Sequence, residues 1–226
     1  EHWRRLGRAL VSSDGYKGLA SWSGTMFEYF MPNLFMPSYR GSLIYESLRF
    51  CVHCQRVHGA ANHTPWGVSE SGFFAFDPQM NYCYKAHGVQ KLGFMRGLNR
   101  ELVISPYSSF LALETDRRAA LKNLRLLKKL GLEGACGLYE AADFTPSRRI
   151  GPGRFETVRS FMVHHLGMSL ISCCNALCGG VMQHRFMSDP EMSAHAQLLQ
   201  EKLPIDGITV GNLHPELPEK PRRAGS

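Results

Sequence analysis

Two segments of this chain place a single carboxylate among small and aromatic residues. Glu70 lies in the stretch WGVSESGF, and Glu140 lies in the stretch GLYEAADF. Breaking a glycosidic bond takes a proton donor for the leaving oxygen and a second carboxylate that attacks the anomeric carbon or activates water. Small neighbours let sugar rings come close to such carboxylates. The two segments therefore predict glycoside chemistry, with Glu70 and Glu140 as its catalytic pair.

Aromatic residues in and around these segments could supply flat apolar faces for pyranose rings: Trp22, Trp66, Tyr82, Tyr84, Tyr107 and Tyr139. A purely structural interpretation of the two carboxylates is also open. In that interpretation Glu70 caps a helix, and Glu140 pairs with an arginine such as Arg148. The spacing of the residues alone does not separate the two interpretations.

Three further residues are ambiguous on the same grounds. Glu28 lies in SWSGTMFEYFMP, and a buried, unpaired carboxylate is costly, so it is either hydrogen-bonded structurally or part of a site. The structural alternative is favoured. His164 and His165 lie in an apolar run, as core and surface histidines or as ligands of sugar hydroxyls. Neighbours on a helix point about 100° apart, so at most one is expected to face a given site.

The seven cysteines are expected to be reduced, buried thiols in a reducing compartment, because their number is odd and most lie in apolar helical stretches. Cys51 and Cys54 have C-x-x-C spacing, but no second pair follows to complete a zinc site. Nothing lowers the thiol pKa that a Cys83–His87 nucleophile pair would need. Neither a metal nor a cofactor is predicted.

The totals describe a globular chain. Its 226 residues, 44% hydrophobic and 20% charged, suffice for one sizeable core or a piece of a larger one. The chain starts at Glu1 rather than Met, so we expect a fragment or a processed product. No signal peptide or run of about 20 apolar residues is visible, so we expect that the protein is soluble or that its membrane part lies outside this segment. The net charge of +7 is scattered and lacks a nucleic-acid-reading motif, so no nucleic-acid partner is expected.

Apolar periodicity predicts a mainly α protein, with helices over residues 43–57, 118–130, 156–178 and 190–203. Gly131 stands where a C-terminal cap is favoured, and Asp189 precedes a proline at the start of the last helix. The third helix is apolar nearly all round, so it is expected to be buried.

Long loops are expected between these helices, over residues 59–86 and 136–154, and both candidate carboxylates lie in them. Strand signals are weak, and residues 102–105 form the best candidate. Residues 206–226 are rich in proline, glycine and charge, which indicates a linker or a disordered tail.

Five segments together resemble, in order, the glycoamylase-like domain of cyclic β-1,2-glucan synthases: SWSGTMFEYFMP, PWGVSESGF, NYCYKAHGV, GLYEAADF and VRSFMVHHLGMSL. The resemblance spans nearly the whole chain except the tail. It implies that residues 1–205 form part or all of an α/α-toroid of the six-hairpin type. If only part is present, the missing helices are expected at the N-terminal side. It also implies an enzyme that closes linear β-1,2-glucan into rings by retaining transglycosylation.

The resemblance carries roles to individual residues. Glu70 matches the acid of one family motif and Glu140 that of another, with Glu70 assigned as the nucleophile and Glu140 as the general acid/base. Lining of the sugar subsites is implied for Trp66, Tyr139, Asp143, His164 and His165. Trp22 and Tyr82 are added as sugar-stacking candidates, and Glu28 as a third acid of the site.

Two other functions stay open beside the cyclising enzyme. One is a hydrolase of the same fold, an endo-β-1,2-glucanase, and the other is a non-catalytic glucan-binding module. The resemblance implies a glucan as partner, together with other domains of a larger synthase. It implies a cytoplasmic location, on an enzyme anchored in the inner membrane.

Overall fold

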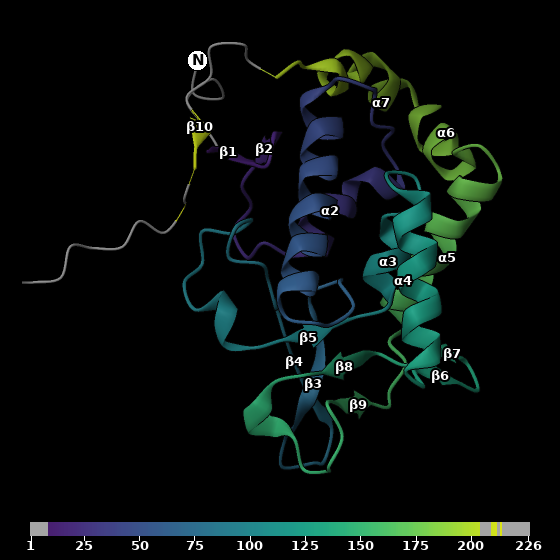
Figure 1. The fold of residues 1–226 in the computed structure, drawn as a ribbon. Coiled ribbons are helices and arrows are strands. Elements are labelled where there is room, and N and C mark those ends of the chain that lie inside the picture. The colour runs from purple at the N-terminus through teal and green to yellow at the C-terminus, as the bar shows by residue number, and fades with distance from the viewer. Residues whose placement is uncertain (1–8, 204–208, 212, 214–226) are drawn as a thin grey trace, which may run out of the picture.

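The computed structural model describes residues 9–203, 209–211 and 213 of the chain (Figure 1). Its α-helices are α1 (Met26–Phe30), α2 (Leu43–Ala61), α3 (Tyr107–Leu111), α4 (Arg117–Lys129), α5 (Val163–Leu177), α6 (Val181–Met187) and α7 (Pro190–Ala194). Short 3-10 helices are η2 (Pro32–Leu34), η3 (Leu98–Arg100), η4 (Pro146–Arg148) and η5 (Ala196–Gln200).

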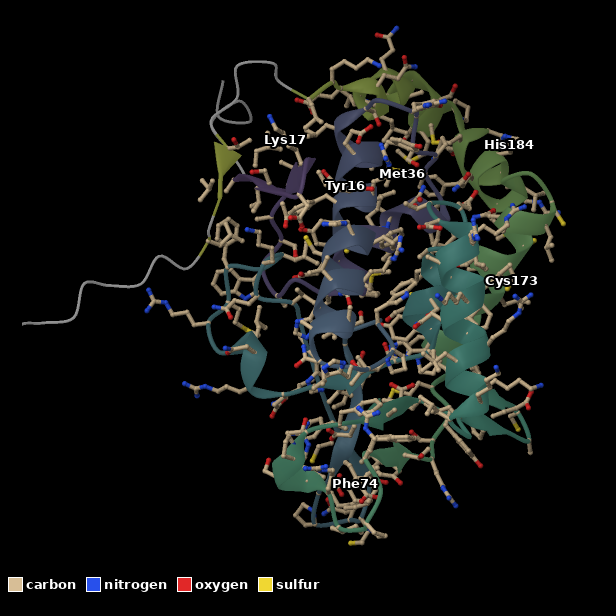
Figure 2. The ribbon with its side chains drawn as sticks, viewed as in Figure 1. Tyr16, Lys17, Met36, Phe74, Cys173 and His184 are labelled. Atoms are coloured by element: carbon tan, nitrogen blue, oxygen red, sulfur yellow. The ribbon has the colours of Figure 1, made fainter. Side chains whose placement is uncertain are left out.

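The strands form small sheets. They are β1 (Leu10–Ser13), β2 (Tyr16–Leu19), β3 (Ser71–Phe76), β4 (Tyr82–Lys85), β5 (Val103–Ile104), β6 (Glu133–Gly134), β7 (Gly137–Leu138), β8 (Ala141–Asp143), β9 (Glu156–Val158) and β10 (Thr209–Val210). They pair in the orders β10–β1–β2, β3–β4, β5–β8–β9 and β6–β7. In Figure 1, α2 runs through the molecule with α3, α4 and α5 together on one side of it. The hairpin β3–β4 and the sheet β5–β8–β9 gather at one end, and Figure 2 places Phe74 there, far from Tyr16 at the other.

The helix α2 confirms the helix predicted over residues 43–57 and extends it to Ala61. It begins where the Ser42 hydroxyl accepts a hydrogen bond from the backbone N–H of Tyr45, a typical N-cap. The middle of its apolar face is enclosed, as Leu48 and Cys51 show, whereas Ile44 in the first turn is exposed. The helix therefore forms the centre of the hydrophobic core.

The helix α4 confirms the prediction over residues 118–130 to within one residue. Asp116 caps its start by accepting from the N–H of Ala119 at 2.9 Å. Gly131 follows the last turn with a φ of +84°, a conformation that favours glycine. Ala120 and Leu127 are buried on one side of α4, and its basic residues cover the other.

The helix predicted over residues 156–178 is wrong at its start and in its burial. Residues Glu156–Val158 form strand β9 beside β8, so α5 begins only at Val163. One face of α5 is buried, but Val163, Leu170 and Leu177 are 86%, 71% and 84% exposed. Strand β9 makes its backbone hydrogen bonds with β8 instead of within a helix. This long-range pairing outweighs the local apolar pattern, and the sequence did not reveal it.

The predicted C-terminal helix over residues 190–203 is shorter than expected. Asp189 caps it as predicted, but α7 ends at Ala194 and the chain continues as the 3-10 helix η5. Most of the tail over residues 206–226 lies outside the described residues. Within the described part, β10 pairs in parallel with β1, so this piece of the tail is a strand and not a linker.

The two expected long loops contain more regular structure than the sequence indicated. Residues 59–86 include the hairpin β3–β4, and residues 136–154 include β7 and β8. The strand expected over residues 102–105 is confirmed at its centre by β5. Because β3 and β8 lie beside each other, the two candidate carboxylates, each directly before one of these strands, are positioned by neighbouring strands rather than by free loops.

The burial of the cysteines differs from the expectation that most of them are enclosed. The seven cysteines are free, as expected, but only Cys51 and Cys54 are buried, while Cys136 and Cys178 are exposed. Among the described helices, none is by itself long and apolar enough to cross a bilayer. The pair α5–α6 passes that test only when joined, and its two members are bent by 96°.

Candidate active site

Glu140 is buried immediately before β8, with only 4% of its surface exposed. Its backbone N–H donates to the carbonyl oxygen of Ser160 at 3.0 Å, which ties it to the segment after β9. Its Oε1 accepts from the backbone N–H of Gly72 at 3.0 Å, and its Oε2 lies 2.9 Å from Nδ1 of His165. One carboxylate oxygen is therefore held by β3 and the other by α5.

Gly72 allows this close approach of strand and carboxylate. A Cβ atom at this position would lie 3.3 Å from Cγ of Glu140 and 3.3 Å from Cγ1 of Val158, which is tighter than nearly all Cβ contacts. Gly72 stands opposite Tyr84 in the β3–β4 ladder. The hairpin β3–β4 thus brings the Gly72 backbone N–H and the Tyr84 side chain to the site from two residues that pair across its strands.

His165 lies in the first turn of α5 and is buried against an aromatic ring. Its imidazole stacks on Tyr107 with centroids 3.8 Å apart and planes 10° apart. The Tyr107 hydroxyl donates to Oγ of Ser69 at 2.8 Å and lies 2.9 Å from the carbonyl oxygen of Glu70. Burial raises the pKa of Tyr107 well above its usual value, so the hydroxyl keeps its proton as a donor.

Tyr84 reaches both histidines with one hydroxyl. Its oxygen lies 3.4 Å from Nε2 of His165 and 3.5 Å from Nε2 of His164. Both rings therefore lie near one hydroxyl, but only His165 lines the cavity beside Glu140, in agreement with the expectation that at most one of the two histidines faces a given site. Burial, together with the charges of Glu70 and Glu140, raises the pKa of Tyr84. Burial and the neighbouring His165 lower the pKa of His164.

Two buried amides hold the segment that leads to Glu70. Gln55 on α2 donates to the carbonyl oxygen of Val68 and accepts from its N–H, both at 2.8 Å. Asn123 on α4 does the same for Trp66, at 2.7 and 3.2 Å. Glu70 follows this clamped segment, is partly exposed and directly precedes β3, so it does not cap a helix.

A small cavity of about 130 Å³ opens beside Glu140 and His165. Its remaining walls are largely apolar and aromatic and include Tyr107, Phe110, Tyr139, Phe161, Met162 and Leu166. Typical ligand cavities measure roughly 300–1,000 Å³, so this one accommodates part of an oligosaccharide at most. It brings together the predicted residues Tyr139, Glu140 and His165, and the Tyr84 hydroxyl lies near His165 and His164.

Asp143 is a correction to the predicted subsite residues. Its side chain is fully buried, and Nε of Arg148 contacts it at 2.6 Å. Its oxygens also accept from the backbone N–H groups of Phe74 and Thr145 at 2.9 and 3.0 Å. Arg148 in turn pairs with Glu101, and not with Glu140. A carboxylate with no exposed surface cannot contact a sugar, so Asp143 braces β8 against β3.

Four other predicted residues also lie outside this cluster. The Glu28 carboxylate accepts from the N–H and hydroxyl of Ser23 and completes a capping box at α1, which confirms its structural interpretation. Trp66 is nearly buried, and Trp22 is 68% exposed. The Tyr82 hydroxyl accepts from the N–H of Arg159. None of the four lines the cavity beside Glu140.

A wider groove of about 810 Å³ lies between α2 and α4. Basic side chains such as Lys122 and Arg125 contribute to its walls, as do Tyr16 and Trp66. Neither candidate carboxylate lines this groove, so its size alone does not make it a reaction site.

The structure adds Gly72 to the site and gives Tyr84 and Tyr107 polar roles that the sequence analysis did not assign. Both tyrosines were expected only as stacking surfaces. A signal for Gly72 was present, because a glycine inside a strand often marks a close backbone approach. No pattern in the sequence indicated which hydroxyl would meet which histidine.

Comparison with known proteins gives relatives whose names refer to glucans or glucoamylases. A family model described as "Putative glucoamylase" matches residues 1–190. The cyclic β-(1,2)-glucan synthase NdvB of Rhizobium meliloti is 42% identical over 206 residues, which is 91% of this chain and 7% of NdvB. The chain thus spans a small part of that relative.

Solved structures share the fold at low sequence identity. A glucoamylase-like protein of Bacteroides fragilis superimposes with a TM-score of 0.65 at 16% identity, over 88% of this chain and 46% of that one. The endo-β-1,2-glucanase of Chitinophaga pinensis gives 0.60 at 16% identity, over 88% and 47%. The family match and the NdvB similarity show that this chain belongs to the glycoamylase family.

Proposed function

We propose that this chain cleaves and re-forms β-1,2-glucosidic bonds and closes linear β-1,2-glucan into rings by retaining transglycosylation, as a glycoside hydrolase-like enzyme. The observation that carries the proposal is the buried Glu140, which opens onto a cavity with aromatic walls, lies 2.9 Å from His165 and accepts from the strand β3 that Glu70 directly precedes. Two carboxylates beside apolar walls suit glycosyl transfer. NdvB, by its name, makes cyclic β-1,2-glucan, which supports this substrate.

The roles of the two carboxylates follow from their surroundings. Oε1 of Glu140 accepts from the backbone N–H of Gly72, and Oε2 lies 2.9 Å from Nδ1 of His165. With a proton on that nitrogen, both oxygens accept hydrogen bonds, which favours the ionised carboxylate that a nucleophile needs. Glu70 is more exposed and can reach a leaving oxygen. This geometry favours Glu140 as the nucleophile and Glu70 as the acid/base, the reverse of the assignment that the resemblance suggested.

The wider context is part of the proposal. We infer that the helices belong to an α/α-toroid and that the chain works within a larger, membrane-anchored synthase on the cytoplasmic side. The support is the similarity to solved glucoamylase-like folds and the small share of NdvB that the chain matches. Tyr139 and His164 are proposed to contact the sugar near Glu140.

Product analysis tests the function directly. The protein is incubated with linear β-1,2-glucan, and the products are digested with an exo-acting β-glucosidase that cannot attack rings. Resistant product from the wild type, lost in Glu70→Gln and Glu140→Gln, is expected. Glu46→Gln is the matched control, because Glu46 pairs with Arg49 on the surface of α2. Resistant product that survives both site variants would refute this catalytic pair.

A hydrolase is the second candidate, because solved relatives include endo-β-1,2-glucanases. It predicts short fragments that the β-glucosidase digests completely. Glucan binding without turnover, unchanged in Glu140→Gln, would instead identify a binding module.

Azide separates the roles of the two carboxylates. With an activated β-glucoside donor, loss of the nucleophile in Glu140→Gly should let azide attack directly and give the α-azide. Loss of the acid/base in Glu70→Gly should give the β-azide through the covalent intermediate. The opposite pattern would restore Glu70 as the nucleophile.

A further inference from the structure

Tyr107 contacts both halves of the candidate site with one side chain. Its hydroxyl lies 2.9 Å from the carbonyl oxygen of Glu70 and 2.8 Å from Oγ of Ser69. Its ring stacks on the imidazole of His165, with centroids 3.8 Å apart and planes 10° apart. That imidazole in turn lies 2.9 Å from Oε2 of Glu140. One buried tyrosine therefore touches the backbone of one candidate carboxylate and the ring that holds the other.

We propose that Tyr107 is a positioning residue that sets the spacing between Glu70, the acid/base, and Glu140, the nucleophile. The inference deepens the proposed function and rests on it, because it takes these two glutamates as the catalytic pair. In retaining glycosidases the two carboxyl groups lie roughly 5 Å apart, whereas inverting enzymes separate them by roughly 6.5 Å or more. The proposed chemistry therefore needs a group that fixes this spacing to within about an ångström.

The main chain that leads to Glu70 is attached at two points to the start of α3. The carbonyl oxygen of Gly67 accepts from the backbone N–H of Ser105 at 2.9 Å and from its hydroxyl at 3.2 Å. Tyr107 opens α3 and meets the carbonyl oxygen of Glu70. Ser69, which is fully buried, also accepts at 2.9 Å from a backbone N–H in the first turn of α1. The backbone of Glu70 is thus fixed to the helices, and its partly exposed side chain extends from that point.

The ring of Tyr107 holds the other half of the site. It faces His165 in the first turn of α5, so the stacked pair joins α3 to α5. A flat ring against the imidazole resists tilting of its plane, which keeps Nδ1 directed at Oε2 of Glu140. Oε1 of that carboxylate is held independently by the backbone N–H of Gly72 at 3.0 Å. Tyr107 therefore acts on Glu140 through the orientation of His165, and on Glu70 through its backbone.

Tyr107→Phe separates the two contacts, because it removes the hydroxyl and keeps the ring. We expect kcat/KM on linear β-1,2-glucan to fall about 10- to 100-fold, since the acid/base moves away from the leaving oxygen. On an activated β-glucoside donor, whose leaving group needs no proton, kcat/KM should fall less than about threefold. Tyr45→Phe, which loses a hydroxyl on α2, should keep both values.

Two kinetic results would overturn the proposal. The first is an unchanged kcat/KM on linear glucan in Tyr107→Phe, which would mean that the hydroxyl does not position the acid/base. The second is an equal loss on the glucan and on the activated donor, which would indicate general damage to the site.

Crystal structures of the wild type and of Tyr107→Phe give a measurement that needs no turnover. The backbone of Glu70 is expected to move by about 0.5–1 Å relative to Glu140, while His165 keeps its contact with that carboxylate. A Glu70 backbone that stays in place would refute the positioning role, whatever the rates show.

Failure of the proposed function gives a different pattern. A wild-type protein without turnover on this glucan refutes the function, while the two crystal structures still decide whether Tyr107 fixes the spacing of the carboxylates.

Discussion

At the scale of single residues, the position of the Glu140 carboxylate depends on the absence of a side chain at Gly72. The strand β3 approaches closely enough for its backbone N–H to bond Oε1 of Glu140 at 3.0 Å. A methyl group in this space would meet Cγ of Glu140 and Cγ1 of Val158 at 3.3 Å. The position of the carboxylate is thus set by a residue that has no side chain and contributes only its backbone N–H.

Gly72→Ala should lower turnover about 10- to 100-fold, because displacing a reacting group by a fraction of an ångström to one ångström costs roughly that much. Initial rates on linear β-1,2-glucan measure it. Gly167→Ala on α5 is the control, since nothing lies within 4 Å of its added Cβ. Equal rates in wild type and Gly72→Ala would show that the carboxylate tolerates the shift.

At the scale of elements, buried polar side chains join helices to the segments that carry the site. Gln55 on α2 and Asn123 on α4 bond the backbone of the segment before Glu70 from two directions. Between η3 and β5, Glu101 pairs with Lys85, His87 and Arg148, and Arg148 also pairs with the buried Asp143. These contacts hold β3, β4 and β8 in register relative to the helices.

Gln55→Met keeps the size of the side chain but leaves the N–H and carbonyl oxygen of Val68 without their partner. Each buried backbone group left unpaired should lower the free energy of unfolding by about 1–3 kcal/mol. Denaturant titration measures this loss. Gln79→Met, on an exposed turn, should stay within about 0.5 kcal/mol of the wild type. A similarly small effect at Gln55 would mean that water replaces the amide.

The Glu101 contacts should make stability depend on acid pH. The hydrogen bond from His87, with those from Lys85 and Arg148, lowers the pKa of Glu101 well below its usual value. A depressed folded-state pKa adds stability that is present above the unfolded value of about 4.3 and is lost as pH falls through the folded value.

Glu101→Gln should therefore lower the free energy of unfolding at pH 7 by about 1.5–3 kcal/mol, with the difference shrinking below about pH 4. Thermal or denaturant unfolding from pH 7 to pH 3 measures both. Glu133→Gln, which removes an exposed pair with Lys128, should change little. A difference that grows toward low pH would contradict the sign of the linkage.

At the scale of the whole molecule, the core is unevenly distributed around the helices. The middle of the central α2 is enclosed on its apolar face, whereas α5 is buried only on the side that carries His165 and Met168. Its other side presents Leu170 and Leu177 to solvent. Figure 2 labels Cys173 on α5, a half-buried residue packed against the core, and the exposed His184 on α6.

Replacing these exposed leucines should cost almost nothing within this chain. Leu170→Gln and Leu177→Gln are expected to change the free energy of unfolding by less than about 0.5 kcal/mol. Leu48→Ala, in the enclosed face of α2, should cost about 2–5 kcal/mol. Denaturant midpoints of the three variants make the comparison. A large loss at Leu170 or Leu177 would show that the outer face of α5 is packed in solution.

The sequence by itself determined the family, the catalytic pair as a hypothesis, and the positions of α2 and α4. These depend on local signals: motif letters, helical periodicity, the Asp116 cap and the Gly131 stop. The tertiary structure alone decided that Glu140 pairs with His165, that the Asp143 carboxylate forms an ion pair with Arg148, and that β9 replaces the start of a predicted helix. Such contacts join residues distant in sequence, and the free energy of burying and pairing them outweighs the weak local preferences that a sequence pattern records.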